Sequence, residues 1–431
     1  MIFKKKWIVC IFIFSIVLTS IPDKSSAIIT YAEFGPVTIE GSNGEYLMVF
    51  KQYTISNEVS VHQAIKSRTM RRLPTEFQIE EINDTEIIEE TFDYNGRTYF
   101  INQTDVVVQD GTAYLLLATW DQTSDNVTFF ALTSENNGVS WSDPILIYNT
   151  SVVYSDDTYY SFDAIEKDDY LVLGYGYKAE VNISGIIFEV AVADVLEINA
   201  NTLIVTSNYT INSGYGLDFE FYNYNGDILV IYTDNPGIAG TVQFDELDDS
   251  YAIVSSIATF SPPENRLKLL KPTVTYWLGL FYVVAQDNLT DVVDAVQGTI
   301  KRESFLWGKS FKVTQGFFGL EVVENSIKNR VIIKAQDNFD GYYRRDPSIT
   351  VYENRLFLTF IVGRGSRFGG RGYPGVAFAF SADGDTWTNN FLGEYSFFMN
   401  LGTYFVIGTV AVFAVSYPSY LVYSKGIKGK K

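Results

Sequence analysis

The sequence predicts an all-β protein, a six-bladed β-propeller with a cleaved signal peptide before it and one transmembrane helix after it. Short runs rich in Val, Ile, Tyr, Phe and Thr alternate with Asn, Asp and Gly clusters, and no long amphipathic helix interrupts them. One two-strand pattern recurs six times. The predicted boundaries are 1–27 for the signal peptide, 28–395 for the propeller, 396–423 for the transmembrane helix and 424–431 for a basic cytoplasmic tail.

The N-terminal segment has the order of a secretory signal peptide. Lys4–Lys6 precede an apolar run, Trp7–Leu18, and the small residues Ser25–Ala27 follow. We expect cleavage near Ala27. An uncleaved anchor is the alternative, although the apolar run is short for a membrane span.

The C-terminal segment predicts a membrane anchor. No charged residue lies between Glu394 and Lys425, and the 20 residues Tyr404–Tyr423 are long enough as a helix to cross a bilayer core of about 30 Å. The tail that follows is basic, which the positive-inside rule places in the cytoplasm. We therefore expect a single-pass protein of the cell membrane with its body outside the cell.

The charge of the body restricts its partners. The segments before Ile28 (net +3) and after Ser424 (net +4) are basic, so the formal charge of −19 becomes −26 for the body between them. An acidic surface excludes nucleic acid as a natural partner and permits cations, neutral glycans or basic proteins. The expected partners are an extracellular glycan or a surface protein, and the lipid bilayer.

Two residue types are nearly absent. Cys10 is the one cysteine and lies in the signal peptide, so the mature chain has no disulfide. His62 is the one histidine, which excludes a His/Cys zinc site and a Ser-His-Asp triad. It stands in an alternating segment and is expected on a strand surface. No metal ligands are predicted, and Ca²⁺ is the cofactor that clustered carboxylates would suit.

Seven sequons match N-x-S/T and agree with an exported, glycosylated surface. With the absence of cysteine they indicate an archaeal cell-surface protein. The acceptors are Asn83, Asn102, Asn126, Asn149, Asn182, Asn208 and Asn288.

The repeats predict the number of blades. The second strands of the six copies begin at Tyr46, Tyr114, Tyr170, Ile228, Leu280 and Leu356, with spacings of 68, 56, 58, 52 and 76 residues. A four-stranded blade needs about 40–50 residues, so each interval holds one blade and its loops. A pair of β-sandwich domains is the rival architecture, but it does not explain six recurrences.

The first strand of each copy would line the propeller axis, with its entry residue at one mouth. The entry residues are Gly35, Asp105, Asp163, Asp218, Lys271 and Asp346. Four aspartates would then converge and make the best candidate site for catalysis or binding. The alternative is that each Asp only caps its incoming turn.

Two turns follow strand-like apolar runs and share a pattern. Ser134–Trp141 reads S-x-N-x-G-x-S-W, and a copy shortened by one residue lies at Ser381–Trp387. A short Asn or Asp side chain can bond the backbone ahead of it, and Gly supplies a positive φ. Both turns resemble the Asp box of sialidase-like β-propellers, and the resemblance implies structural roles for Ser134, Asn136, Gly138, Trp141, Ser381, Asp383, Gly384 and Trp387.

The last copy also resembles the sialidase arginine motif. Arg345 and Pro347 match its R-I-P form, and Arg364 follows the next strand. The resemblance implies that Arg345 would grip a sugar carboxylate. Lys271 and Arg364 are the other predicted ligand-binding residues, although the family's second and third arginines have no counterpart at equivalent inner positions. Between Arg364 and Val376 no Asp or Glu stands where the family has its acid/base aspartate. We therefore expect a degenerate sialidase-like propeller.

Three functions stay open. The first is glycan recognition at an acidic mouth beside aromatic loops. The second is an active glycoside hydrolase that uses two of Asp105, Asp163, Asp218 and Asp346 as acid and base or nucleophile. The third is a surface scaffold or protein-binding module, with or without Ca²⁺.

Overall fold

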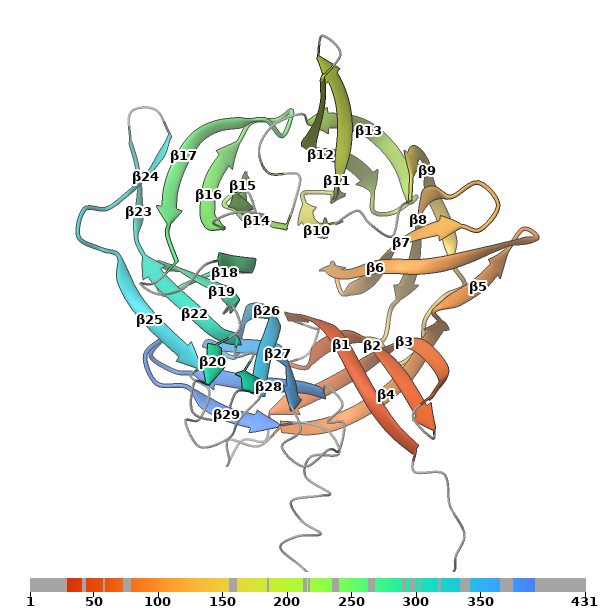
Figure 1. Cartoon of the computed structure of the whole chain (residues 1–431), viewed down its shortest axis with the longest axis horizontal. Helices are drawn as coiled ribbons and strands as arrows, with labels where there is room; N and C mark the ends of the chain where they lie inside the picture. The colour runs from red at the N-terminus through yellow and green to blue at the C-terminus, as the bar shows by residue number, and fades with distance from the viewer. Residues whose placement is uncertain are drawn as a thin grey trace, which may run out of the picture.

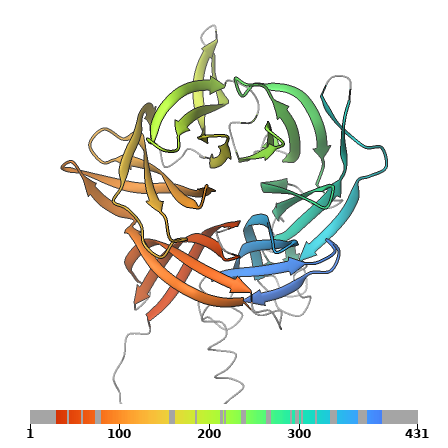
Figure 2. The same cartoon turned by 180° about the vertical axis from the view of Figure 1, so that it is seen from behind.

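The computed structural model describes residues 29–40, 44–56, 59–72, 79–154, 161–183, 186–211, 215, 218–234, 240–262, 268–288, 292–294, 299–301, 304–316, 319–333, 342–364 and 375–391. Six antiparallel sheets surround a central axis, and the chain enters them one after another (Figures 1 and 2). The predicted six-bladed propeller is thereby confirmed.

The first three blades are built from consecutive strands. Blade 1 contains β1 (Ile29–Glu40), β2 (Tyr46–Ser56), β3 (Val59–Arg72) and β4 (Ile79–Glu89). Blade 2 contains β5 (Thr91–Tyr94), β6 (Arg97–Gln109), β7 (Thr112–Asp121), β8 (Asn126–Ser134) and β9 (Ile145–Val153). Blade 3 contains β10 (Ser161–Lys167), β11 (Tyr170–Ile183), β12 (Ile186–Asn199) and β13 (Ile204–Ile211).

The other three blades follow the same plan. Blade 4 contains β14 (Phe219–Tyr224), β15 (Asp227–Asp234), β16 (Thr241–Leu247) and β17 (Ile253–Phe260). Blade 5 contains β18 (Lys268–Trp277), β19 (Leu280–Asn288), β22 (Ser304–Phe311) and β25 (Lys328–Ile333), with side hairpins β20–β21 (Val292–Asp294, Thr299–Lys301) and β23–β24 (Val313–Gln315, Leu320–Val322). Blade 6 contains β26 (Tyr342–Tyr352), β27 (Arg355–Arg364), β28 (Gly375–Ser381) and β29 (Thr388–Phe391).

Burial along the strands follows their place in the blade. Strands are counted from the axial strand, which in blade 2 is β6, because β5 pairs only with its first four residues. The second strand of blade 2, β7, is buried on both faces for most of its length. The outer strand β13 of blade 3 alternates between exposed and half-buried residues. A strand covered on both faces reads as a continuous apolar run, and one with a solvent face alternates. All six predicted second strands occupy this covered position, in β2, β7, β11, β15, β19 and β27.

Two-residue turns with positive φ join the first and second strands of several blades. The turns Asp110-Gly111, Asn225-Gly226 and Leu278-Gly279 all have both residues in this region. Such turns match the right-handed twist of the strands that they connect. They fix the register of the inner hairpin, which the functional site depends on.

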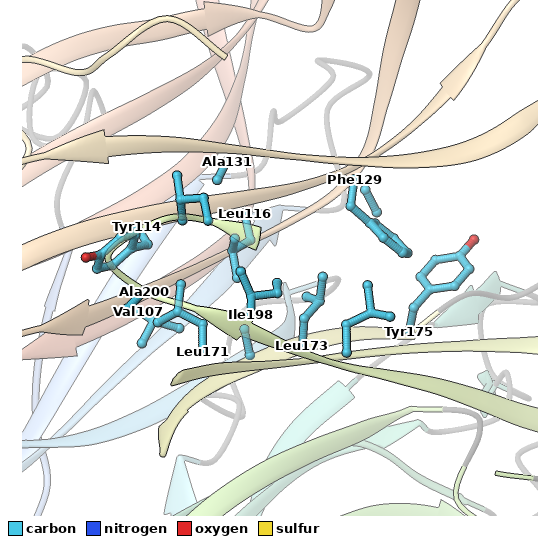
Figure 3. Close-up of a cluster of buried hydrophobic side chains, with 14 of the residues drawn as sticks. Val107, Tyr114, Leu116, Phe129, Ala131, Leu171, Leu173, Tyr175, Ile198 and Ala200 are labelled. Carbon is cyan, nitrogen blue, oxygen red and sulfur yellow. The ribbon is translucent and has the colours of Figure 1, made fainter. Parts of the chain in front are cut away.

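Apolar side chains fill the space between neighbouring blades. One cluster joins blades 2 and 3, where Leu116 and Phe129 face Leu171, Leu173 and Tyr175 (Figure 3). Equivalent clusters lie between every other pair of neighbours. The cluster between blades 6 and 1 packs Tyr46 against Phe357 and Tyr352. Side-chain packing therefore closes the ring, since each blade is formed by its own stretch of the chain and no described strand is exchanged between blades 6 and 1.

The turn 134–141 connects β8 to β9 and holds its shape through side chains. Ser134 Oγ accepts a hydrogen bond from Gly138 N (2.9 Å), and Asn136 Oδ1 accepts one from Ser140 N (2.9 Å). The turn also contacts blade 1, because Ser67 Oγ donates to Gly138 O (2.8 Å) and Trp141 Nε1 donates to Ser67 Oγ (3.2 Å). It ties blade 2 to the blade before it.

The turn 381–387 occupies the same position in blade 6, between β28 and β29. Ser381 Oγ accepts from Gly384 N (2.8 Å), and Asp383 Oδ1 accepts from Thr386 N (2.7 Å). Gly384 lies against Tyr282 of β19, so this turn also contacts the preceding blade. Both turns lie between the third and fourth strands, away from the axis.

The predicted signal peptide and transmembrane helix lie outside the described residues. Within the described ranges, no helix is long and apolar enough to cross a membrane. His62 lies on β3 with its side chain partly exposed, and its Nε2 is 2.9 Å from Glu86 Oε2. The expectation that it is a strand-surface residue is confirmed.

Candidate functional site

A cavity of about 350 Å³ lies on the propeller axis. Its walls come from the inner strands of blades 2 to 6 and from Lys51 on β2. The inner strands β1, β6, β10, β14, β18 and β26 contact one another in that order around the axis, which brings their residues together (Figure 1). The lining is strongly acidic, with Asp105, Asp163, Asp218, Glu220 and Asp346 against Lys51 and Lys271.

The four aspartates and Lys271 singled out in the sequence all border this cavity. They do not occupy equivalent positions, however. Asp218, Lys271 and Asp346 have positive φ values of 58°, 50° and 50°, whereas Asp105 and Asp163 lie within regular strand. The sequence alignment was therefore wrong by two residues in blades 2 and 3.

The shift has a physical cause in the backbone. The register of β18 with β19 skips from Leu270 to Thr273, and that of β26 with β27 skips from Arg345 to Ser348. A β-bulge of this kind adds residues to one strand without changing its apolar pattern. Residues at the same distance from the start of the first strand are therefore not equivalent in blades with and without a bulge.

Equivalent positions in the different blades can be identified by counting back from the hairpin that joins the first and second strands. The last paired residues of the inner strands are Gln109, Lys167, Tyr224, Trp277 and Tyr352. The residue four positions earlier is Asp105, Asp163, Glu220, Thr273 or Ser348. We call these five the staple residues, and Glu220 is the member that the sequence analysis missed.

Staple residues join each blade to the next. A side-chain oxygen of one member accepts a hydrogen bond from the backbone N–H that directly follows the next member. The bonds run from Ala164 to Asp105 Oδ2 (2.6 Å), from Phe221 to Asp163 Oδ2 (2.6 Å), from Val274 to Glu220 Oε1 (2.9 Å) and from Ile349 to Thr273 Oγ1 (3.2 Å). The inner strands of blades 2 to 6 are linked in series.

A second contact lies nearer the entry of the strands. Lys271 N donates to Asp218 Oδ2 (2.6 Å), and the Lys271 ammonium lies 3.4 Å from Asp218 Oδ1. This pair joins blades 4 and 5 two residues before the staple bond between them. Asp105, Asp163 and Asp218 therefore bond across blades, which differs from the alternative that each Asp caps only its own incoming turn.

Burial changes the protonation of the staple carboxyls. Burial raises the pKa of Asp105 to about 7 against the pull of the N–H donors of Val106 and Ala164. Burial, followed by the charges of Asp105 and Glu220, raises the pKa of Asp163 well above its usual value. Burial also raises the pKa of Glu220 to about 8. Asp105 and Asp163 lie close enough for each carboxyl to affect the pKa of the other.

Asp105, Asp163 and Glu220 are called the trio below. The two lysines in the cavity wall are paired with residues outside it. Lys51 forms an ion pair with Glu90 and donates to Ile101 O (3.3 Å), while Lys271 is paired with Asp218. No ion pair joins Asp105, Asp163 or Glu220 to a lysine or arginine in the described part of the chain.

Neutral polar groups complete the cavity wall. Asn102, Gln103 and Thr104 of β6 face Ser161 and Ser348 around the axis. Asn102 belongs to a sequon, yet its Nδ2 is buried and has no hydrogen-bond partner among the described residues. Asn208 is exposed, with Nδ2 2.9 Å from Tyr148 Oη.

The remaining predicted ligand residues lie in blade 6. Arg345 is paired with Ile361 and Arg364 with Tyr342, in strands β26 and β27. The side chains of both arginines lie outside the described set.

Among the described residues, one group has the composition of a metal site: His62, Glu86 and Glu89, whose ligand atoms lie within 4.8 Å of one another. It stands on the partly exposed surface of β3 and β4, away from the axis. The carboxyl groups of Asp105, Asp163 and Glu220 form another oxygen-rich group, but four of their six oxygens already accept backbone N–H bonds.

No protein-family model matches the sequence, and no curated protein matches it. Solved structures that are similar include a mutant sialidase of Trypanosoma rangeli that displays trans-sialidase activity, at 10% identity and TM-score 0.49, over 82% of this chain and 54% of that one. An arabinofuranosidase mutant of Fusarium graminearum matches at 10% identity and TM-score 0.49, over 81% and 93% of the two chains. A GH32 β-fructofuranosidase of Bombyx mori matches at 13% identity and TM-score 0.42 over 68% of this chain, and the match spans 62% of that enzyme.

Proposed function

We propose that the chain is a glycan-binding propeller whose ligand binds in the axial cavity. The observation that carries this proposal is the convergence of five carboxylates and several neutral polar side chains on one cavity of about 350 Å³. That volume lies within the range of small-molecule sites, about 300–1,000 Å³. Carboxylates and amides are well suited to hold sugar hydroxyls by hydrogen bonds.

The charge of the cavity argues against an anionic sugar. A sialic-acid carboxylate would meet five acidic side chains, and both lysines are already paired with Glu90 and Asp218. Burying a charged carboxylate beside several acidic side chains is unfavourable. The proposal is therefore a sialidase-like architecture, with Asp-box turns at 134–141 and 381–387, that no longer binds sialosides.

The setting of the domain forms part of the proposal. A signal peptide at 1–27, a membrane helix at 396–423 and the sequons would display this cavity on the outside of an archaeal cell. Asn102 is the sequon that we exclude from glycosylation, since its amide nitrogen is buried. Mass spectrometry of the membrane-purified protein tests this setting, and an intact N-terminal peptide beginning at Met1 would contradict it.

Binding is tested with the full-length protein on a panel of neutral, amino and acidic sugars. We expect binding of neutral or amino sugars, and a loss of about tenfold or more in the double variant Asp163→Asn/Asp218→Asn. Asp245→Asn is the matched control, because Asp245 is a buried carboxyl outside the cavity, hydrogen-bonded to Tyr232 (2.8 Å). Unchanged binding in the double variant would place the site elsewhere.

A second candidate function is glycoside hydrolysis, which the raised pKa values favour. A carboxylic acid that stays protonated near neutral pH can act as a general acid while a neighbouring carboxylate acts as base or nucleophile. Asp105, Asp163 and Glu220 form such a group. Wild-type turnover of neutral aryl glycosides, lowered about a hundredfold or more in Asp163→Asn, is the expected result for an enzyme. Absence of turnover on the whole panel would contradict it.

A further inference from the structure

Three staple residues are acids, although the bond between blades does not need an acid. In blade 5 the hydroxyl of Thr273 accepts the N–H of Ile349, and it does so from the register position that Glu220 occupies in blade 4. A neutral oxygen therefore suffices for the bond between blades. In blades 2, 3 and 4 the same position holds a carboxyl group, and the three stand on adjacent strands.

Placing three acids side by side is unfavourable for the fold. Buried charges without a counter-charge destabilise a protein strongly, and hydroxyl or amide groups could make the same hydrogen bonds without that cost. No lysine or arginine in the described ranges neutralises Asp105, Asp163 or Glu220. The presence of three acids here is best explained by something that enters the cavity.

The free oxygens show what could enter. Both oxygens of Asp105 accept backbone N–H bonds, from Val106 and Ala164. Asp163 Oδ1 and Glu220 Oε2 accept none from the described backbone. Two carboxylate oxygens of adjacent blades are thus available at the cavity, whose wall also holds neutral side chains.

We propose that the axial cavity binds a protonated primary amine, carried by an amino sugar whose nitrogen is not acetylated. This rests on the proposed glycan-binding function and specifies its ligand class. An ammonium group has three N–H donors and one positive charge, so two or three acceptors satisfy it. The sugar hydroxyls would be held by neutral residues such as Gln103, Thr104 and Ser161.

A calcium ion fits the cavity less well. Ca²⁺ requires six to eight oxygen ligands at about 2.3–2.6 Å. Four of the six oxygens of the trio are already directed at backbone N–H groups, so few remain to coordinate the ion. An ammonium group needs only two or three acceptors, fewer than the six to eight oxygens that Ca²⁺ requires.

Titration calorimetry of the full-length protein with glucosamine and with N-acetylglucosamine, near neutral pH, tests the inference. We expect glucosamine to bind about tenfold or more tightly, since a charge-assisted hydrogen bond is worth about 1.5–3 kcal/mol. Binding of the amine should also release protons from the trio. This appears as a dependence of the measured heat on the ionisation enthalpy of the buffer.

The variant Glu220→Gln isolates the charge. It keeps a neutral Oε1 for Val274 and removes the negative charge from the cavity, so the preference for glucosamine should fall to about twofold or less. Asp245→Asn should keep the full preference. Equal binding of the two sugars by the wild-type protein would overturn the inference and leave glycan binding intact.

Two other outcomes are also decisive. Binding of neither sugar class, with none on the wider panel, would overturn the proposed function itself. A rise in Tm with CaCl₂ that Glu220→Gln abolishes, together with no binding of glucosamine by the wild-type protein, would identify the cavity as a cation site and overturn the amine assignment.

Discussion

Glu220 serves the fold and the cavity with the same carboxyl group. Its Oε1 accepts from Val274 N and from Thr273 Oγ1, both at 2.9 Å, which binds β14 to β18. Its Oε2 accepts no hydrogen bond from the described backbone and is the oxygen that the proposal assigns to the ligand. Burial opposes the charge that a ligand would use, so the protonation of this residue links stability to binding.

The pH dependence of stability follows from this residue. Its pKa is about 8 in the folded protein against the ordinary 4.5, so the folded state binds the proton more tightly between these values. Stability is then lost as the pH rises from about 4.5 through about 8. We expect Tm to fall over this range, and Glu220→Gln to raise Tm at about pH 8 by about 2 °C or more. Thermal unfolding followed by circular dichroism measures both.

The control is Asp227→Asn, at an exposed hairpin position. It should leave the slope of Tm against pH unchanged. If the Tm of Glu220→Gln depends on pH as steeply as that of the wild-type protein, the pKa of Glu220 does not change on folding.

At the scale of elements, the turns between third and fourth strands act as contacts between blades. Gly138 has φ of 83°, and a Cβ atom there would collide with Leu47 Cδ1 on β2 of blade 1. Gly384 has φ of 76° and stands against Tyr282 on β19 of blade 5, with a Cβ distance of 2.6 Å to Cε1. In both turns glycine is required by backbone conformation and by close approach.

Gly138→Ala separates these two requirements when it is compared with Gly111→Ala. Gly111 has nearly the same φ, 82°, but nothing lies within 4 Å of its Cβ position. Both variants should lose about 1 kcal/mol for the strained φ, and Gly138→Ala should lose about 1–3 kcal/mol more for overpacking. Urea unfolding measures the difference. Equal losses would mean that blade 1 moves aside at no cost.

For the whole molecule, the sequence was sufficient to predict the number and order of the blades. The six second strands are continuous apolar runs because they are covered on both faces, and this signal does not depend on register. Asp105, Asp163, Asp218, Asp346 and Lys271 were also correctly predicted to converge.

The detail of the site was harder to predict from the sequence. Bulges at Lys271-Pro272 and Asp346-Pro347 shift the register without changing the apolar pattern, so Glu220 was not recognised as the partner of Asp105 and Asp163. The two-residue hairpin turns, such as Asn225-Gly226, were a usable signal, because a turn of known length fixes register from its own side. Lys51 could not be found in this way, since it reaches the cavity from a second strand.

The staple residues connect the inner strands of blades 2 to 6, and Thr273 tests this connection. Its Oγ1 donates to Glu220 in blade 4 and accepts from Ile349 N in blade 6, so one hydroxyl connects three blades. Thr273→Val removes that hydroxyl at nearly constant volume, leaves a buried N–H without its acceptor and should cost about 1–3 kcal/mol. Thr273→Ser keeps the hydroxyl and should cost clearly less, although it loses a methyl group. Urea unfolding of the two variants, with amide exchange at Ile349 as a local readout, distinguishes the cases. If Thr273→Val is no less stable than Thr273→Ser, packing between blades holds the ring and the hydroxyl contributes little.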